Sequence, residues 1–192
     1  MVKRIAVFAS GTGTNFSALQ SAIVERKIPA EIVLLVCDQA AAPVIKRAEA
    51  VGVPVLVINY KDFATKAAAE TVILTSLYAH QVAAILLAGY MRIVGKTLLT
   101  AYPHRIINLH PALLPKFPGR QGIADAFAAG VSETGVTVHF IDAGIDTGQV
   151  IRQQRVSVES DDTLASLTER IHQIEHELYP DVLAELIATK KI

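Results

Sequence analysis

Two polar residues, Asn108 and His110, stand at the end of an apolar run that begins at Ile106. Strand side chains alternate between two faces, so Asn108 and His110 are expected to project from the same face. Pro111 follows directly and cannot donate a ladder hydrogen bond, which predicts that the strand ends at Leu109. The carboxyl ends of parallel strands are where α/β proteins place their chemistry. We therefore interpret this amide and imidazole as a candidate reaction centre; the alternative is an ordinary hydrogen-bonded histidine.

A second loop, Ile141–Gly148, carries two carboxylates, Asp142 and Asp146. A carboxylate beside an imidazole favours the charged ring. Asp146 lies in a tight segment flanked by glycines, which makes it the candidate partner of His110. Asp142 could act in the same way, although we expect it to solvate the loop edge. An ordinary turn aspartate is the alternative for both residues.

A glycine-containing stretch, Ser10–Asn15, follows an apolar run and opens a predicted helix. Glycine lets backbone N–H groups approach an anion, and a helix N-terminus adds partial positive charge, so a phosphate is the expected guest. A phosphate monoester fits better than a pyrophosphate, because Phe16 occupies the position where the dinucleotide pattern needs a small residue. Asp38 could still mimic the ribose-binding acid of NAD enzymes. A turn that merely needs glycine is the remaining alternative.

The other histidines and the single cysteine are not expected to do chemistry. His139 lies in an alternating strand and is predicted to be structural. Four more histidines are predicted at the surface of helices or loops: His80, His104, His172 and His176. Their spacing matches no zinc signature, so no metal is expected. Cys37 excludes an internal disulfide and lies in a strand without an obvious activating partner.

The composition narrows the possible partners and the compartment. The chain has 192 residues, 52% of them hydrophobic, with a mean hydropathy of +0.40, so it can bury a large core. Eighteen basic and eighteen acidic residues cancel, which leaves no electrostatic footprint for nucleic acid or an anionic membrane. The apolar run near the start is shorter than the roughly 7–15 residues of a signal peptide core. We expect a cytoplasmic protein that binds small molecules, as a monomer or homodimer.

Apolar runs alternate with helical patterns through the first half of the chain. The five strands expected there are Ile5–Ala9, Ile32–Cys37, Val53–Ile58, Val82–Leu87 and a run from Arg105. This order predicts an α/β fold with a doubly wound, mostly parallel sheet. Val136–Ile141 and Gln149–Val158 alternate in polarity, which predicts an antiparallel C-terminal extension. No repeat or linker divides the chain, so residues 1–192 are interpreted as a single domain.

Helix limits are predicted from capping residues. Asp62 is expected to cap a helix over Phe63–His80. Ser160–Asp162 is expected to cap the final helix, and Pro180 to break or restart it.

These motifs together carry a family resemblance over nearly the whole chain. The stretches concerned are Ser10–Asn15, Ala88–Ile93, Ile107–Pro115, Gly135–Phe140 and Asp146-Thr147-Gly148. In these the chain resembles the phosphoribosylglycinamide formyltransferases, a folate-dependent family of purine synthesis with a Rossmann-like fold. The resemblance implies direct transfer of the formyl group of 10-formyltetrahydrofolate, a co-substrate, to the amine of phosphoribosylglycinamide through a tetrahedral intermediate.

The resemblance also implies roles for individual residues. Asn108, His110 and Asp146 match the catalytic trio. Gly13, Thr14, Asn15 and Glu175 match positions that bind phosphoribosylglycinamide. Lys66, Met91, Arg92, Ile93, Val94 and Asn108 match positions that bind the folate. Lys66 would keep a charge where relatives carry Arg but would lose the bidentate fork. The segment Gly119–Ile123 departs from the family pattern, which often has a histidine there, so its role stays open.

Other activities remain possible at this stage. A formyltetrahydrofolate hydrolase or a methionyl-tRNA formyltransferase would share the Asn-x-His-Pro run. We expect the hydrolase to carry an extra N-terminal regulatory domain. We expect the tRNA enzyme to carry a C-terminal extension and a basic surface for tRNA. A nucleotide-binding module or an NAD-linked oxidoreductase would explain Gly11 and Gly13. Either would leave Asn108, His110 and Asp146 unused.

Overall fold

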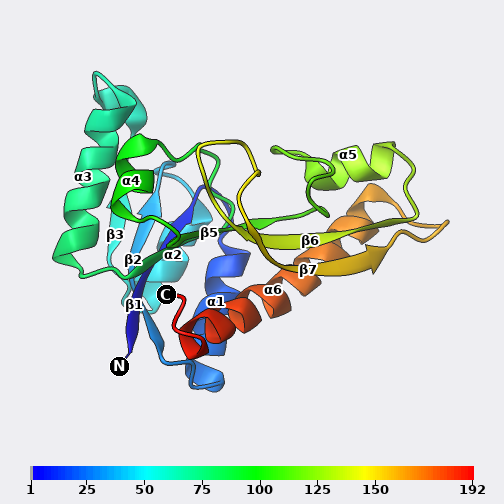
Figure 1. Ribbon diagram of the computed structural model, residues 1–192, viewed down its shortest axis with the longest axis horizontal. Helices are drawn as coiled ribbons and strands as arrows, with labels where there is room; N and C mark the ends of the chain where they lie inside the picture. Colours follow the sequence, from blue (N-terminus) through cyan, green and yellow to red (C-terminus); the bar gives the residue numbers. More distant parts are fainter. Residues whose placement is uncertain (1) are drawn as a thin grey trace.

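A computed structural model describes residues 2–192 as a seven-stranded sheet with helices on both faces (Figure 1). The strand order is β3-β2-β1-β4-β5-β6-β7. Strands β1 to β5 run parallel, and β6 and β7 add antiparallel to the β5 edge. The predicted fold class is confirmed, including its antiparallel extension.

The elements follow the order of the apolar runs in the sequence. The strands are β1 (Lys3–Ala9), β2 (Ala30–Cys37), β3 (Val55–Val57), β4 (Ala84–Leu87), β5 (Ile106–His110), β6 (Glu133–Phe140) and β7 (Val150–Ser157). The helices are α1 (Thr14–Glu25), α2 (Pro43–Ala50), α3 (Lys66–Ala79), α4 (Lys96–Ala101), α5 (Gly122–Ala128) and α6 (Leu164–Ala188), with a 3₁₀ turn at Tyr60–Asp62.

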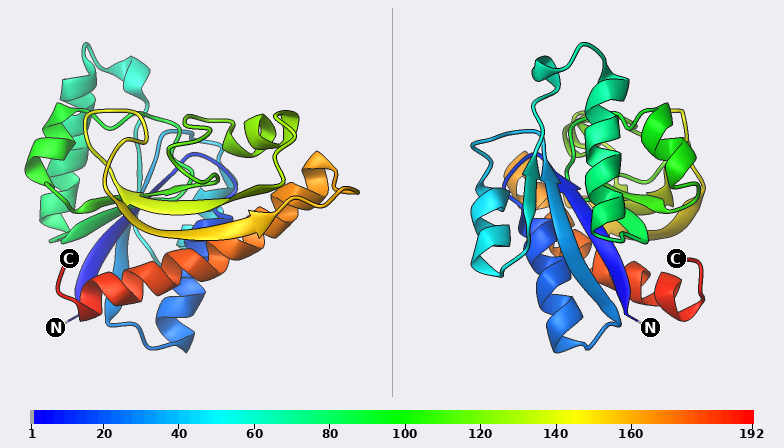
Figure 2. Two further views of the ribbon diagram at one scale, coloured as in Figure 1. Left: turned by 45° about the vertical axis from the view of Figure 1, so that its right-hand side comes forward. Right: turned by 90° about the vertical axis from the view of Figure 1, so that its left-hand side faces the viewer.

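Helices lie on both faces of the sheet (Figure 2), and each face carries its own cluster of buried apolar side chains. Ile5 and Val7 of β1 join the layer formed with α1, α2 and α6, whereas Ala6 and Phe8 join the layer formed with α3 and α4. Strands buried on both faces need apolar residues at every position, which is why β1 reads as a continuous apolar run.

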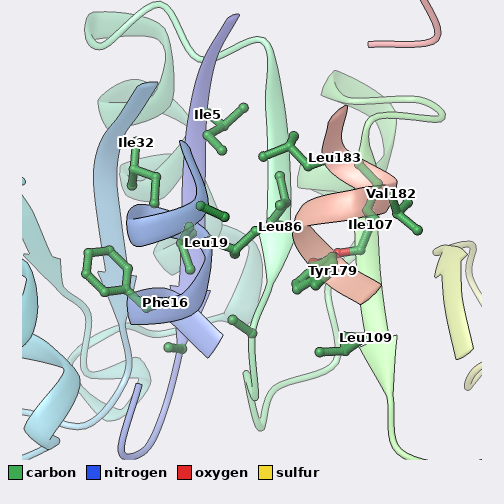
Figure 3. Close-up of a cluster of buried hydrophobic side chains, with 14 of the residues drawn as sticks. Ile5, Phe16, Leu19, Ile32, Leu86, Ile107, Leu109, Tyr179, Val182 and Leu183 are labelled. Carbon is green, nitrogen blue, oxygen red and sulfur yellow. The ribbon is translucent and has the colours of Figure 1, made fainter. Parts of the chain in front are cut away.

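Tyr179 fixes α6 to the centre of the sheet (Figure 3). Its buried hydroxyl lies 3.1 Å from the carbonyl oxygen of Leu87, the last residue of β4, and 3.0 Å from that of Ile107 in β5. A buried hydroxyl that reached no acceptor would destabilise the fold, so this contact sets where α6 crosses. It thereby positions the rest of that helix over the carboxyl ends of the strands.

Two predicted boundaries are wrong for identifiable reasons. Helix α3 begins at Lys66 because Thr65 caps it, accepting from Ala68 N at 3.1 Å, while Asp62 accepts from Asn59. Strand β5 continues through His110, because its antiparallel neighbour β6 extends the pairing to that residue.

The final helix also differs from the prediction. Its N-cap is Thr163, in a capping box with Ser166, and Asp162 instead accepts from the Ser166 hydroxyl. Pro180 lies inside an unbroken helix. An interior proline costs roughly 3 kcal/mol, and burial of apolar side chains on both sides of Pro180 outweighs that cost. Within residues 2–192, no helix is long and apolar enough to cross a membrane.

Candidate active site

The carboxyl ends of β1, β4 and β5 open into a cavity of ≈ 460 Å³. Among its lining residues, Gly11–Asn15 and Glu175 form a group that we call the glycine-loop end. Met91–Val94 and Arg120 form a second group, which we call the Met91–Val94 end. Asn108, His110 and Asp146 also line the cavity, which has the size of an ordinary small-molecule site.

The structure brings the predicted trio together. Asp146 Oδ2 lies 3.5 Å from His110 Nδ1, and its Oδ1 lies 3.4 Å from Asn108 Nδ2. His110 Nε2 lies 2.8 Å from the carbonyl oxygen of Phe117, which can only accept, so Nε2 carries a hydrogen. The ring is therefore oriented with Nδ1 toward Asp146, and Nδ1 is the atom through which a proton could be exchanged.

One short loop, Phe117–Arg120, holds this arrangement in place. Phe117 accepts from His110, Gly119 N donates to Asp146 Oδ2 at 2.7 Å, and Arg120 Nη2 donates to the carbonyl oxygen of Met91 at 2.9 Å. The loop turns through a left-handed residue at Gly119, with φ 92°, which favours glycine. The segment that departs from the family pattern thus begins in a loop that contacts His110, Asp146 and the Met91–Val94 segment.

His139, predicted to be purely structural, lies beside the trio. It is paired with Asn108 in the β5–β6 register, and its Nε2 lies 3.1 Å from Asn108 Nδ2. Its Nδ1 donates to Phe140 O at 2.8 Å, which leaves Nε2 as an acceptor for the Asn108 amide. Burial lowers the pKa of His139, more than the nearby Asp146 raises it, so the ring is neutral near pH 7. The alternation of β6 could have indicated this position from the sequence, because it places His139 on the sheet face opposite to Val138.

The glycine-loop end is built from backbone. Gly13 has φ 78°, and an added Cβ would lie 2.4 Å from Val44 Cγ2, so only glycine fits. The first helical bond of α1 runs from Ser17 N to Gly13 O at 3.0 Å. The amides of Thr14 and Asn15 precede it and have no acceptor within the helix, so they can bind an anion.

Glu175 reaches this end from α6. It is buried and accepts from Asn15 Nδ2 at 3.0 Å. Burial raises its pKa to about 7, and the Asn15 hydrogen bond only partly opposes this effect. Asn15 Oδ1 is buried and has no hydrogen-bond partner among residues 2–192, so it can accept from a ligand. His172, predicted at the surface, lines the cavity one turn before Glu175.

A polar network supports the Met91–Val94 end. Asp38 accepts from Ser10 Oγ at 2.5 Å and from Arg92 Nε at 2.7 Å, and Met91 N donates to Ser10 Oγ at 2.8 Å. Burial alone would raise the pKa of Asp38, but the hydrogen bonds from Ser10, Arg92 and Gln39 outweigh it and hold the pKa below its usual value. Asp38 therefore anchors the segment as a carboxylate.

Lys66 is not among the residues that line the cavity, and its contact with the folate stays a prediction. Its Nζ lies 4.0 Å from Glu70 Oε1 in the first turn of α3, outside the cavity lining. Glu70 is itself fixed by Gly95 N, which donates to it at 2.6 Å. Through Glu70, the first turn of α3 therefore contacts the residue that follows Val94.

Residues 3–183 match the profile of the formyl transferase family. The chain belongs to that family. It is 47% identical to the phosphoribosylglycinamide formyltransferase of Bacillus subtilis, over 97% of this chain and 95% of that one. It is 41% identical to the trifunctional purine biosynthetic protein adenosine-3 of Drosophila melanogaster, over 96% of this chain and 14% of that protein. The crystal structure of glycinamide ribonucleotide transformylase 1 from Geobacillus kaustophilus superposes with a TM-score of 0.94 at 53% identity, covering 97% and 99% of the two chains.

The expected resemblance is therefore confirmed, and this formyl transferase is an enzyme. The oxidoreductase alternative loses its support. The oxygens of Asp38 are taken by Ser10, Gln39 and Arg92 rather than left for a ribose. Phe16 is buried in the core, where the dinucleotide pattern needs a small residue.

Proposed function

We propose that this chain transfers the formyl group of 10-formyltetrahydrofolate to the amine of phosphoribosylglycinamide, in de novo purine synthesis. The products are the N-formyl compound and tetrahydrofolate. The observation that carries the proposal is the convergence of Asn108, His110 and Asp146 in one cavity, between an anion-binding helix end and the Met91–Val94 segment. The similarity to named formyltransferases supports the same substrates.

The two ends of the cavity suit the two substrates. The acceptor's phosphate would bind the N-terminus of α1 at Gly13, Thr14 and Asn15, where the amides are free. Its polar groups beyond the phosphate would meet Glu175, which accepts from Asn15 Nδ2, and Asn15 Oδ1, which has no hydrogen-bond partner among residues 2–192. The folate would lie along Met91, Arg92, Ile93 and Val94, which line the cavity.

The reaction begins when the neutral amine attacks the formyl carbon and an oxyanion develops. Asn108 donates to that oxygen. The hydrogen bond from Asn108 Nδ2 to Asp146 is long, at 3.4 Å, and therefore weak. The N–H in this bond can leave Asp146 and donate to the oxyanion. Neutral His139 accepts the other N–H and keeps the amide in the donating orientation.

Proton transfer completes the step. Protonated His110 gives its Nδ1 proton to the leaving folate nitrogen, while Asp146 accepts the proton lost by the amine, directly or through water. The proton on Asp146 then returns to His110 across their 3.5 Å contact. The bond between the formyl carbon and the folate nitrogen then breaks, and the bond between the formyl carbon and the acceptor amine remains. The formyl group thus passes directly between the substrates, so no covalent enzyme intermediate is needed.

An absorbance assay with a 10-formylfolate analogue tests the proposal. Deformylation that requires phosphoribosylglycinamide is the expected result. Deformylation without the acceptor would assign a hydrolase instead, and no deformylation with either would leave only a binding module. Asp146→Asn serves as the matched variant, since it keeps the size of the side chain and removes the charge.

A further inference from the structure

One buried hydroxyl group fastens the proline-rich loop that follows His110 to β6 and β7. Thr137 lies opposite His110 in the β5–β6 register and is 0% exposed. Its Oγ1 donates to the carbonyl oxygen of Ala112 at 2.6 Å and accepts from Leu114 N at 3.1 Å. Gln153 Nε2 donates to the same Oγ1 at 2.9 Å and to Leu114 O at 2.8 Å. The hydroxyl group therefore uses its hydrogen and both of its lone pairs.

A second buried threonine on β6 shows that burial alone does not produce such contacts. Thr134 is 1% exposed, and its Oγ1 has no hydrogen-bond partner among residues 2–192. A buried hydroxyl group without a partner makes no hydrogen bond that offsets its desolvation, which costs about 1–3 kcal/mol. Thr134 and Thr137 thus share residue type, strand and burial, but they differ in whether the hydroxyl group holds another segment of the chain.

The other end of the fastened loop contacts the ring of His110. Phe117 O accepts from His110 Nε2 at 2.8 Å. Phe117 has a φ of 54°, a left-handed conformation that bulky residues rarely adopt. Such strain persists only where the surrounding structure enforces it, and it is concentrated at functional sites. The loop is held at its start by the hydrogen bonds of Thr137, and at its end it directs a carbonyl group at His110.

We propose that Thr137, together with Gln153, positions His110 for proton transfer, an assignment that rests on the proposed function. The contact between Phe117 O and Nε2 keeps Nδ1 facing Asp146 Oδ2 at 3.5 Å. Thr137 and Gln153 do not line the cavity, so they act on the reaction through His110 rather than through a substrate. A misplacement of about 1 Å can lower a rate about 10²-fold even when the substituted residue lies far from the chemistry.

The test makes the same substitution at the two threonines. Thr137→Val keeps the size of the side chain and removes the hydroxyl group, so kcat is expected to fall about 10–10²-fold while KM for each substrate changes less than about twofold. Thr137→Ser keeps the hydroxyl group and should restore most of kcat. Thr134→Val is the matched control and should keep the kcat of the unmodified chain, because the hydroxyl group that it removes holds no other segment.

The ring of His110 provides a readout that a loss of stability alone would not change. Nitrogen-15 chemical shifts, measured without substrate, show which ring nitrogen carries the hydrogen in the neutral imidazole. In the unmodified chain we expect the hydrogen on Nε2, where Phe117 O accepts it. In Thr137→Val a larger share should lie on Nδ1, which faces Asp146. Thr134→Val should keep the hydrogen on Nε2, and His110→Gln identifies the signals by their loss.

Two substitutions at Phe117 test the other end of the loop and do not require that Thr137→Val folds. Phe117→Asn and Phe117→Val both remove the aromatic ring. Asparagine tolerates the left-handed conformation, whereas β-branched valine does not. The carbonyl group should therefore stay directed at His110 only in Phe117→Asn, and kcat should be about tenfold lower in Phe117→Val than in Phe117→Asn. Equal kcat values in the two variants would overturn the proposal.

Unchanged kcat in Thr137→Val would also overturn it, as would an equal fall in Thr134→Val. The same holds for a fall in kcat that Thr137→Ser does not restore, or for a fall that leaves the ring hydrogen of His110 on Nε2. Absence of formyl transfer in the unmodified chain would instead overturn the proposed function. The ring signals would then still decide whether Thr137 positions His110.

Discussion

The glycine-loop end and the Met91–Val94 end of the cavity are built differently. At the first, contiguous residues at the start of α1 supply backbone amides, and Gly13 is the only residue type that fits its position. At the second, Asp38 and Arg120 come from segments far apart in the sequence and hold the Met91–Val94 segment through side chains. A site built from the backbone of neighbouring residues is rigid and can be predicted from the sequence. A site built from side-chain contacts between distant segments can have its ligand affinity changed by single substitutions.

Asn108 lines the cavity that both groups share and is proposed to act on the reacting atoms, so its loss should give the largest effect. Asn108→Ala removes a donor to the developing oxyanion, and we expect kcat to fall about 10²–10³-fold with smaller changes in either KM. Steady-state kinetics with each substrate varied in turn is the measurement. Nearly unchanged turnover would remove Asn108 from that role.

The glycine-loop end contains one titratable side chain whose effect should appear in stability. Burial raises the pKa of Glu175 from 4.5 to about 7, so its contribution to stability is complete below pH 4.5 and is lost as pH rises to 7. The free energy of unfolding should fall by about 1.4 kcal/mol per pH unit in that window, relative to Glu175→Gln.

Urea unfolding at several pH values measures this slope. Glu177→Gln, an exposed change on the same helix, is the control and should keep the slope of the unmodified chain. If Glu175→Gln showed the same pH dependence of stability as the unmodified chain, Glu175 would not be the group that causes it.

Backbone fit at the same end is tested by Gly13→Ala. The added Cβ would lie 2.4 Å from Val44 Cγ2 at a φ of 78°, which is expected to cost about 1–3 kcal/mol and to raise KM for the acceptor but not for the donor. Thermal unfolding and KM for each substrate are the measurements. Gly11→Ala is the control for stability, because its Cβ would meet nothing within 4 Å. Equal stability losses in both variants would argue against a specific clash at Gly13.

The smallest effect is expected at the Met91–Val94 end. Asp38→Asn weakens the anchors of Ser10 and Arg92, so KM for the donor should rise about fivefold while KM for the acceptor stays constant. Asp62→Asn, at an exposed site outside the cavity lining, is the control. If Asp38→Asn instead raised KM for the acceptor, the division of the cavity into two ends would be wrong.

Local periodicity was enough to predict much of this molecule. The apolar runs of β1 and β2 identified strands buried on both faces, and the alternation after residue 135 identified the antiparallel edge. Asn108 and His110 could be assigned to one face because strand parity is fixed by covalent geometry. The position of Gly13 before α1 was equally local, since a tight turn and a helix start need only neighbouring residues.

Contacts between distant segments could not be predicted in the same way. His139 joined the site because the β5–β6 register sets it opposite Asn108, and no local pattern specifies that register. Arg120 lines the cavity because the path of the Phe117–Arg120 loop brings it to Met91 O, and no local pattern predicts that contact.

The sequence by itself therefore determined the sheet, the phosphate-type loop and the pairing of an amide with an imidazole at one strand end. Each depends on residues within a few positions of one another, where periodicity and turn chemistry act directly. Only the tertiary structure decided that Asp146 meets both residues, that neutral His139 supports Asn108, and that Arg120 lines the cavity beside Met91. Those contacts depend on strand register and loop path, which are fixed by packing of the whole chain rather than by any one segment.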